Sequence, residues 1–142
     1  MELGNARILL TGATGGLGGA LAHELSAAGA ELLLAARDMQ KLGRLRDSLN
    51  TRAVIAQADL NSGDDIAALA RTARDFEVNV LINNAGIGCF GLLEQQPWQD
   101  IERTLSTNLL TPIRLTQAML PWLKAQPQAA IVNIGSAFGS IP

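Results

Sequence analysis

A glycine-rich stretch near the amino terminus constrains the fold of this chain more than any other feature. Residues 11–18 read Thr-Gly-Ala-Thr-Gly-Gly-Leu-Gly, directly after the apolar run Ile8-Leu9-Leu10 and directly before a segment of helical periodicity. Glycines let the backbone turn sharply between a strand and a helix and leave room for a phosphate group to approach closely. Free amides at the positive end of the following helix attract such an anion. The stretch therefore predicts a strand-turn-helix unit that binds phosphate.

Short apolar runs alternate with segments of helical periodicity along the chain. A parallel strand reads as a continuous apolar run when helices cover both of its faces. The predicted strands are Ile8–Leu10, Leu32–Ala35, Ala53–Ala56, Val78–Ile82 and Ala130–Ile134. Strands that alternate with helices are typical of an α/β fold with a doubly wound parallel sheet. No repeat or linker interrupts the pattern, so we expect a single domain over residues 1–142.

Three helices are marked by the residues at their ends. Short polar side chains accept hydrogen bonds from the first free amides of a helix, and a glycine commonly follows the last turn. The predicted helices run from Leu17 to Ala28 with Gly29 as the stop, from the cap Asp38 to about Leu49, and onward from a cap at Asn61 or Ser62.

A longer helical region begins near Pro97 and continues to about Lys124. Proline suits the first turn of a helix. Pro112, however, lies inside the region and is expected to kink or divide it, because proline lacks the N–H group that a helix interior requires. A helix that is apolar on two sides is usually covered on both. The two predicted faces are Leu109, Ile113, Leu120 and Leu123 on one side, and Leu115, Met119 and Trp122 on the other.

Charge and cysteine content exclude several function classes. The 142 residues carry 11 basic and 13 acidic side chains, for a formal net charge of -2, with no basic stripe to attract nucleic acid. No apolar stretch approaches the length needed to cross a membrane. Cys89 is the only cysteine, so neither an intramolecular disulfide nor a cysteine-based metal cluster can form. We expect a cytoplasmic protein with no metal site and with neither nucleic acid nor membrane as a partner.

The glycine turn and three further elements together resemble the classical short-chain dehydrogenases/reductases. The elements are Thr11-Gly12-x-x-x-Gly16-x-Gly18, Asn83-Asn84-Ala85-Gly86, Asn108, and Ile134-Gly135-Ser136. The glycines at 12, 15 and 18 also fit the extended, epimerase-like branch, but the Asn-Asn-Ala-Gly element favours the classical one. The resemblance implies a seven-stranded Rossmann sheet, of which the first five strands, in the order 3-2-1-4-5, are expected here. We therefore expect the Rossmann domain to be incomplete at its carboxyl end.

The resemblance implies a nicotinamide coenzyme whose diphosphate lies against the glycine turn. The residues expected there are Gly12, Thr14, Gly16, Leu17 and Gly18. Ala36 and Arg37 stand at the end of the second strand, where a carboxylate would accept hydrogen bonds from a free ribose hydroxyl. A guanidinium instead pairs with a 2'-phosphate, so Arg37 favours NADP(H) over NAD. The alternative is a solvated arginine that pairs with Asp38.

Three further strand ends are expected to contact the coenzyme. In the family, an aspartate at the position of Asp59 approaches the adenine amino group, and the amide of the next residue, Leu60, helps to fix the ring. Asp59 is alternatively a helix cap. The Asn84-Ala85-Gly86 segment lies at the carboxyl end of the fourth strand, where open parallel sheets bind ligands, and Ile134 ends the predicted fifth strand. Asn83 alternatively holds neighbouring strands together through its amide.

Ser136 and Asn108 are the predicted catalytic residues. Ser136 resembles the family serine that donates a hydrogen bond to the substrate carbonyl and stabilises the growing oxyanion. Asn108 resembles the asparagine that holds a water in a proton relay, and the alternative is an exposed asparagine or a simple kink. The family's general acid is a tyrosine about a dozen residues beyond the serine, followed by a lysine, and the 142 residues contain no tyrosine. We therefore expect this chain by itself to be inactive.

Three functions fit these observations. The first is part of an NADP(H)-dependent oxidoreductase that interconverts a small-molecule alcohol and a carbonyl by hydride transfer, assembled as a dimer or tetramer as family members commonly are. The second is a nucleotide-binding module or sensor without catalysis. The third is a structural remnant that neither binds nor reacts. His23 is predicted to lie at the surface, and Cys89 to be a buried thiol.

Overall fold

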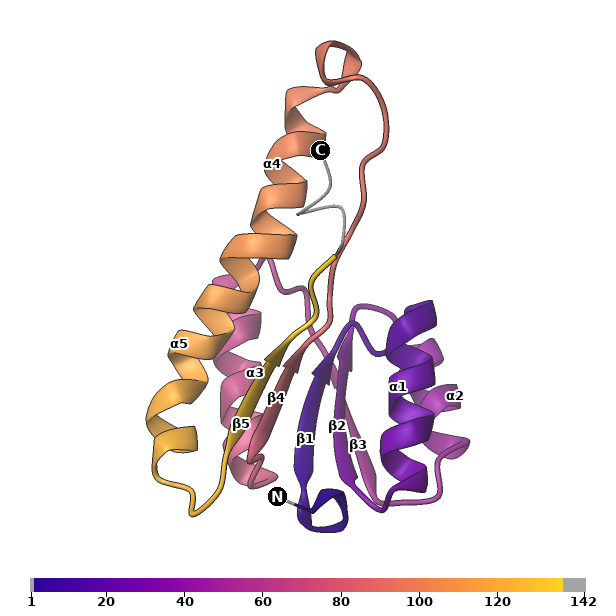
Figure 1. Ribbon diagram of the computed structural model, residues 1–142, viewed down its shortest axis with the longest axis vertical. Helices are drawn as coiled ribbons and strands as arrows, with labels where there is room; N and C mark the ends of the chain where they lie inside the picture. Colours follow the sequence, from indigo (N-terminus) through magenta and orange to yellow (C-terminus); the bar gives the residue numbers. More distant parts are fainter. Residues whose placement is uncertain (1, 137–142) are drawn as a thin grey trace.

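The computed structural model describes residues 2–136, which form a five-stranded parallel sheet between two layers of helices (Figure 1). The strand order is β3-β2-β1-β4-β5, and each neighbouring pair is parallel. The strands are β1 (Arg7–Thr11), β2 (Glu31–Ala36), β3 (Ala53–Gln57), β4 (Val80–Asn83) and β5 (Ala130–Asn133). The predicted α/β class, the doubly wound parallel sheet and the strand order are confirmed.

Helices cover both faces of the sheet. The helices α1 (Gly16–Ala27) and α2 (Met39–Asp47) lie on one face, and α3 (Gly63–Asp75) and α5 (Thr111–Lys124) lie on the other (Figure 1). The remaining helical elements are α4 (Trp98–Leu105) and the short turns η1 (Leu3–Asn5), η2 (Leu93–Gln95) and η3 (Ser106–Leu110). Figure 1 shows α4 extending well beyond the carboxyl ends of the strands. No helix in the described part of the chain is both long and apolar enough to cross a membrane.

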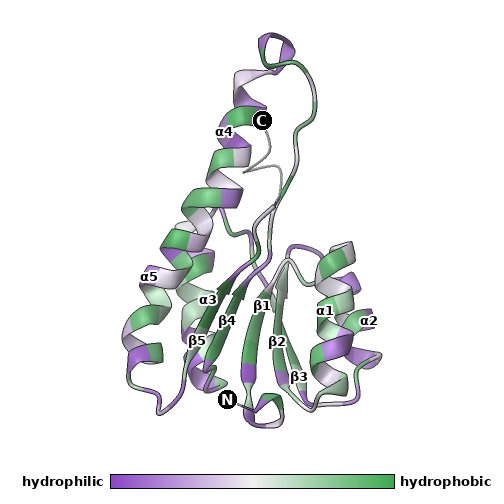
Figure 2. Ribbon diagram, viewed as in Figure 1, coloured by the Kyte–Doolittle hydropathy of each residue, from purple (hydrophilic) through white to green (hydrophobic). Residues whose placement is uncertain are grey.

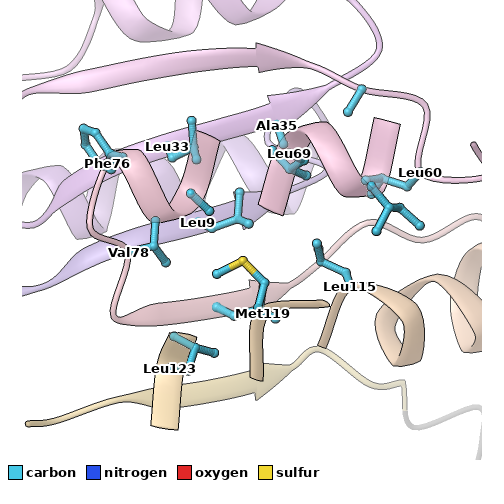
Figure 3. Close-up of a cluster of buried hydrophobic side chains, with 14 residues drawn as sticks. Leu9, Leu33, Ala35, Leu60, Leu69, Phe76, Val78, Leu115, Met119 and Leu123 are labelled. Carbon is cyan, nitrogen blue, oxygen red and sulfur yellow. The ribbon is translucent and has the colours of Figure 1, made fainter. Parts of the chain in front are cut away.

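Two hydrophobic clusters fill the spaces between the sheet and its helical layers. Successive side chains of a strand point to opposite faces, so Leu9 and Leu10 belong to different clusters. Leu9 packs in the cluster that includes Leu69 of α3 and Met119 of α5 (Figure 3). The strands are apolar along most of their length (Figure 2), which is the pattern expected of a parallel sheet covered on both faces.

The predicted caps are confirmed in two helices. The side chain of Asp38 accepts a hydrogen bond from the amide of Lys41 at 2.9 Å, and that of Ser62 accepts one from the amide of Asp65 at 3.2 Å. Ser62, rather than Asn61 or Asp59, is therefore the cap of α3. Helix α2 ends at Asp47, slightly before the predicted end. The predicted stop after α1, Gly29, adopts φ +90°, a left-handed conformation that glycine adopts without strain.

The long helical region contains one π-helical turn, η3, between α4 and α5. The amide of Thr111 donates to the carbonyl of Ser106, five residues earlier, instead of four. Pro112 follows in the first turn of α5, where a missing N–H group is tolerated. The irregularity expected at Pro112 thus lies one turn before it. The rod continues through the turn without breaking into two separate helices (Figure 1).

The two apolar faces of the helical region formed by η3 and α5 are not equally covered by the rest of the protein. Leu115, Met119 and Leu123 are buried against the sheet, so the prediction that placed Leu123 on the opposite face was wrong. Leu123 lies eight residues after Leu115, close enough in helical phase to share its face. Leu109 and Ile113 are 53% and 56% exposed. The described part of the chain therefore presents an uncovered apolar face on this helix.

Candidate functional site

A cleft of about 2000 Å³ lies at the carboxyl ends of the strands. Open parallel sheets bind ligands at this edge, where the loops that follow the strands separate. All the residues predicted for the site line the cleft. They are Gly12, Thr14, Gly16, Leu17, Gly18, Arg37, Asp59, Leu60, Asn84, Ala85, Gly86, Asn108, Ile134 and Ser136. Segments far apart in the sequence thus meet at one surface.

Two glycines of the turn are required by packing. Gly12 adopts φ +65°, and a Cβ atom there would lie 2.7 Å from the Cα of Ala85. A Cβ atom at Gly18 would lie 2.2 Å from the carbonyl oxygen of Gly12. Neither distance is compatible with a side chain unless backbone moves. These glycines therefore hold the turn, the start of α1 and the loop after β4 close together.

Gly16 has a different environment from Gly12 and Gly18. A Cβ atom at Gly16 would meet no described atom within 4 Å, although Gly16 lines the cleft. It is the first residue of α1, which has Gly15 as its cap. The first N–H groups of a helix have no partner inside the helix and carry the positive end of its dipole. Space and donors at the start of α1 therefore fit the diphosphate of a dinucleotide.

Thr11 and Asn84 connect the glycine turn to the end of β4. The hydroxyl of Thr11 accepts hydrogen bonds from the amides of Asn84 and Ala85, at 3.0 and 3.1 Å, and donates to the carbonyl of Ile82 at 3.3 Å. The side-chain amide of Asn84 donates to the carbonyls of Thr11 and Gly12, at 2.9 and 3.3 Å. Sequence reasoning missed this role of Thr11, although its place at a strand end before the turn was a signal. The side-chain amide of Asn84 therefore holds the segment after β4 against the glycine turn.

Asn83 links strands, as its alternative interpretation predicted. Its side-chain nitrogen donates to the Oδ1 atom of Asn133 in β5 at 2.8 Å and to the hydroxyl of Thr116 in α5 at 3.3 Å. Asn83 is buried, and a buried amide is costly unless its groups are paired. The bridge holds β5, the strand that leads to Ser136, beside β4.

Arg37 lies at the cleft directly after β2, and its side chain is exposed. Its carbonyl accepts a hydrogen bond from the side-chain amide of Gln57 at 2.9 Å, which fixes the backbone there. The carboxylate of Asp38 caps α2 and lies 3.9 Å from the ammonium group of Lys41. Among residues 2–136, no ion pair of Arg37 is found, so the alternative pairing with Asp38 is not observed. Arg37 is thus an exposed basic residue that lines the cleft.

The loop after β3 is held by its own side chains. The Oδ1 atom of Asp59 accepts hydrogen bonds from the amide and the side-chain nitrogen of Asn61, at 3.0 and 3.3 Å. The amide of Asp59 donates to Asp65 in the first turn of α3 at 2.7 Å. Asp59 is therefore not the helix cap that one interpretation predicted. It is an exposed carboxylate at the cleft, in a loop anchored at both ends.

Asn108 fixes the loop after β4. Its Oδ1 atom accepts from the amide of Ile87 at 2.9 Å, and its Nδ2 atom donates to the carbonyl of Ile87 at 2.8 Å. A Cβ atom at Gly86 would lie 3.4 Å from the same Oδ1 atom, so the loop passes close to the helix. Asn108 is exposed and lies in the irregular turn η3, as its alternative interpretation predicted, but its side chain is hydrogen-bonded to Ile87.

The remaining titratable candidates fall outside this arrangement. His23 is exposed on α1, as predicted. Cys89 is half-buried rather than buried, because it lies in the loop between β4 and η2. No group of three or more potential metal ligands is found in the part of the chain that the structure describes. Ser136 lies in the cleft two residues after Ile134.

Known proteins are similar to this chain in sequence and in fold. A family model described as short chain dehydrogenase matches residues 6–142. The chain belongs to the short-chain dehydrogenase family. The resemblance inferred from the glycine turn and the Asn-Asn-Ala-Gly element is thereby confirmed, because the matched region contains both.

Individual members of the short-chain dehydrogenase family agree with this assignment. The chain is 35% identical to nodulation protein G of Rhizobium meliloti over 142 residues, which cover 99% of this chain and 58% of that protein. A short-chain dehydrogenase from Sphingobium yanoikuyae in complex with NADPH superimposes with a TM-score of 0.86 at 37% identity, over 96% of this chain and 56% of that one. A metagenomic short-chain oxidoreductase in complex with NADP gives 0.89 at 33% identity, over 96% and 65%. The chain thus spans little more than half the length of several relatives.

Proposed function

We propose that this chain binds NADP(H) in the cleft and forms the coenzyme-binding part of an oxidoreductase that interconverts an alcohol and a carbonyl. The observation that carries the proposal is the start of α1, where Gly16 has no described atom within 4 Å of a Cβ position and faces the cleft. The solved relatives that hold NADP and NADPH support it. The diphosphate rests on the amides of Gly16, Leu17 and Gly18.

Arg37 carries the preference for the phosphorylated coenzyme in this proposal. A guanidinium binds phosphate through two parallel hydrogen bonds, and Arg37 is unpaired within residues 2–136 while facing the cleft. A carboxylate would be the matching group for an unmodified ribose. Asp38 does not supply this carboxylate for the ribose, because its own carboxylate caps α2. NADP(H) is therefore favoured over NAD(H).

The bound nicotinamide would supply the hydride. Ser136 donates a hydrogen bond to the carbonyl oxygen of the substrate and stabilises the charge that develops there. Asn108 acts on the backbone, because both ends of its side chain bind Ile87 and thereby shape the loop beneath the substrate. In this proposal the main-chain carbonyl of Asn108, which cannot accept a hydrogen bond from Pro112, binds the water of the proton relay.

A nucleotide-binding module without turnover is the second candidate. It is supported by the predicted coenzyme contacts, which all line the cleft and need no catalytic group beside them. Under this proposal the chain binds the coenzyme but does not reduce a carbonyl. Consumption of NADPH in the presence of small ketones and aldehydes, measured with a longer protein that contains this chain, separates the two functions, because only the oxidoreductase oxidises the coenzyme.

A matched pair of glycine variants tests the binding proposal. Gly16→Ala places a methyl group where the diphosphate would lie, and Gly43→Ala adds the same group in α2, also with nothing within 4 Å. We expect NADPH fluorescence titrations to show binding in the micromolar range for the wild type and Gly43→Ala, and affinity about tenfold or more lower for Gly16→Ala. Equal affinities for all three proteins would contradict the site.

The proposal also includes assembly and location. The uncovered apolar face on η3 and α5, with Leu109 and Ile113, supports a homo-oligomer. The single cysteine supports a reducing compartment such as the cytoplasm. Light scattering at several protein concentrations tests the assembly, since a monomeric mass at every concentration would contradict it.

A further inference from the structure

The loop after β3 and the π-helical turn η3 are joined by hydroxyl groups. The hydroxyl of Ser106 donates to the Oδ1 atom of Asn61 at 2.8 Å, and that of Thr107 lies 3.5 Å from the same atom. The buried hydroxyl of Thr111 donates to the carbonyl of Leu60 at 2.8 Å. These contacts link residues that lie 45 to 51 positions apart in the sequence. The same helical turn carries Asn108, which binds the loop after β4.

The carboxamide of Asn61 has a defined orientation. A carboxylate only accepts hydrogen bonds, so the nitrogen of the carboxamide must face Asp59 and the oxygen must face the hydroxyls. The nitrogen donates to the Oδ1 atom of Asp59 at 3.3 Å, and the backbone amide of Asn61 donates to that same atom at 3.0 Å. Asn61 therefore lies directly between Asp59 and the turn η3.

These bonds leave one oxygen of Asp59 available. Within residues 2–136, the Oδ2 atom of Asp59 has no hydrogen-bond partner, and Asp59 lines the cleft. An exposed carboxylate normally samples several rotamers, and ordering it costs entropy. Two hydrogen bonds to Oδ1 restrict the carboxylate before a ligand arrives. A pre-oriented acceptor binds a donor group more tightly than a mobile one.

We propose that Asn61 is a positioning residue for adenine recognition. It holds the carboxylate of Asp59 so that Oδ2 accepts a hydrogen bond from the exocyclic amino group of the adenine ring. Through Ser106 and Thr107 it anchors this carboxylate to the helical turn that carries Asn108. The inference rests on the proposed function, because it requires the adenine of the coenzyme to lie beside Asp59.

Hypoxanthine provides the matching test, because it has a carbonyl oxygen where adenine has the amino group. Binding of NADPH and of its hypoxanthine analogue is measured by fluorescence for the wild type, Asn61→Ala and Asn50→Ala. Asn50 is an exposed asparagine that precedes β3, at the amino end of the strand and away from the cleft, and it serves as the matched control. We expect the wild type and Asn50→Ala to bind NADPH about tenfold more tightly than the analogue. We expect this ratio to fall most in Asn61→Ala, which loses the side-chain bond to Oδ1 of Asp59 and keeps only the backbone one.

The ratio separates positioning from folding. General destabilisation of the loop lowers the affinity for both dinucleotides together and leaves their ratio unchanged. Ser106→Ala is a second variant, which keeps the hydrogen bonds between Asn61 and Asp59 but removes their anchor at 2.8 Å. We expect it to give an intermediate ratio, and it replaces Asn61→Ala if that variant does not fold.

Each contrary outcome has a distinct meaning. An unchanged ratio in Asn61→Ala and Ser106→Ala, with the wild type preferring adenine, overturns the role of Asn61 and leaves the proposed function intact. Equal affinity of the wild type for both dinucleotides overturns the reading of the amino group by Asp59, again without affecting coenzyme binding. Failure of the folded wild type to bind either dinucleotide overturns the proposed function and this inference with it.

Discussion

The side chain of Asn108 makes two hydrogen bonds to the main chain of a single residue, Ile87. Oδ1 accepts from the amide of Ile87 at 2.9 Å, and Nδ2 donates to its carbonyl at 2.8 Å. Together the two bonds satisfy the N–H and C=O groups of Ile87, as a neighbouring strand would, and they fix a loop segment that lies outside any strand. The position of the loop after β4, which lines the cleft, therefore depends on a residue of η3 rather than on strand pairing.

Asn108→Ala should loosen this loop without unfolding the protein. Both backbone groups of Ile87 become accessible to water, so we expect stability to fall by no more than about 1 kcal/mol. Hydrogen exchange of the Ile87 amide should accelerate, because its partner is gone. Exchange at Leu81, inside β4, is the internal control and should not change. Unchanged exchange at Ile87 would show that this hydrogen bond does not hold the loop.

Gly18→Ala should destabilise the fold itself. Its Cβ atom would lie 2.2 Å from the carbonyl oxygen of Gly12 and 2.9 Å from the side-chain nitrogen of Asn84, so the turn must shift. Overpacking of this kind costs about 1 to 3 kcal/mol. Gly43→Ala, inside α2 and without neighbours, should instead stabilise by about 0.5 to 1 kcal/mol. Denaturant unfolding of both variants measures the contrast, and equal stabilities would refute the close packing at Gly18.

Arg37→Asp should reverse the coenzyme preference. The substitution removes the cation that we propose binds the 2'-phosphate and supplies an acceptor for a free ribose hydroxyl. Arg71→Asp, on the exposed side of α3, makes the same change in net charge away from the cleft and is the control. The ratio of NADPH to NADH affinity should fall below one only in Arg37→Asp. Selectivity that is the same in both variants would remove Arg37 from the site.

Ser136→Ala should slow catalysis in an active protein that contains this chain. Loss of one donor to a developing oxyanion lowers kcat by about 10² to 10³. The affinity for NADPH should stay within about twofold of the wild type, since the proposed partner of the hydroxyl is the substrate and not the coenzyme. Steady-state kinetics and a binding titration measure the two effects. A wild-type kcat would assign Ser136 a structural role.

The layered fold follows from local sequence signals. Each strand is a continuous apolar run, and Asp38, Ser62 and Gly29 mark helix ends through their own chemistry. The sequence also places the glycine turn between β1 and α1, which positions the cleft. The start of β4 was predicted two residues too early, because Val78 is buried without belonging to the strand. Burial alone therefore does not define where hydrogen-bond pairing begins.

The polar contacts across the cleft could not be predicted from the sequence. The bond of Asn108 to Ile87 and that of Ser106 to Asn61 connect loops whose approach depends on how α4 and η3 pass over the sheet. The π-helical turn itself is a compromise between helix continuity and Pro112, and sequence periodicity does not register one extra residue in a turn. The spatial role of Asn61 appears only once the helix and the loop are placed together.

The central claim is that amides at the start of α1 hold the diphosphate of a nicotinamide dinucleotide. Calorimetric titration of the folded wild-type protein with NADPH, followed by NADH, tests it most directly. We expect saturable heat with one equivalent of NADPH, a dissociation constant in the micromolar range, and binding of NADH about tenfold or more weaker. A folded protein that gives no heat of binding with either coenzyme would contradict it.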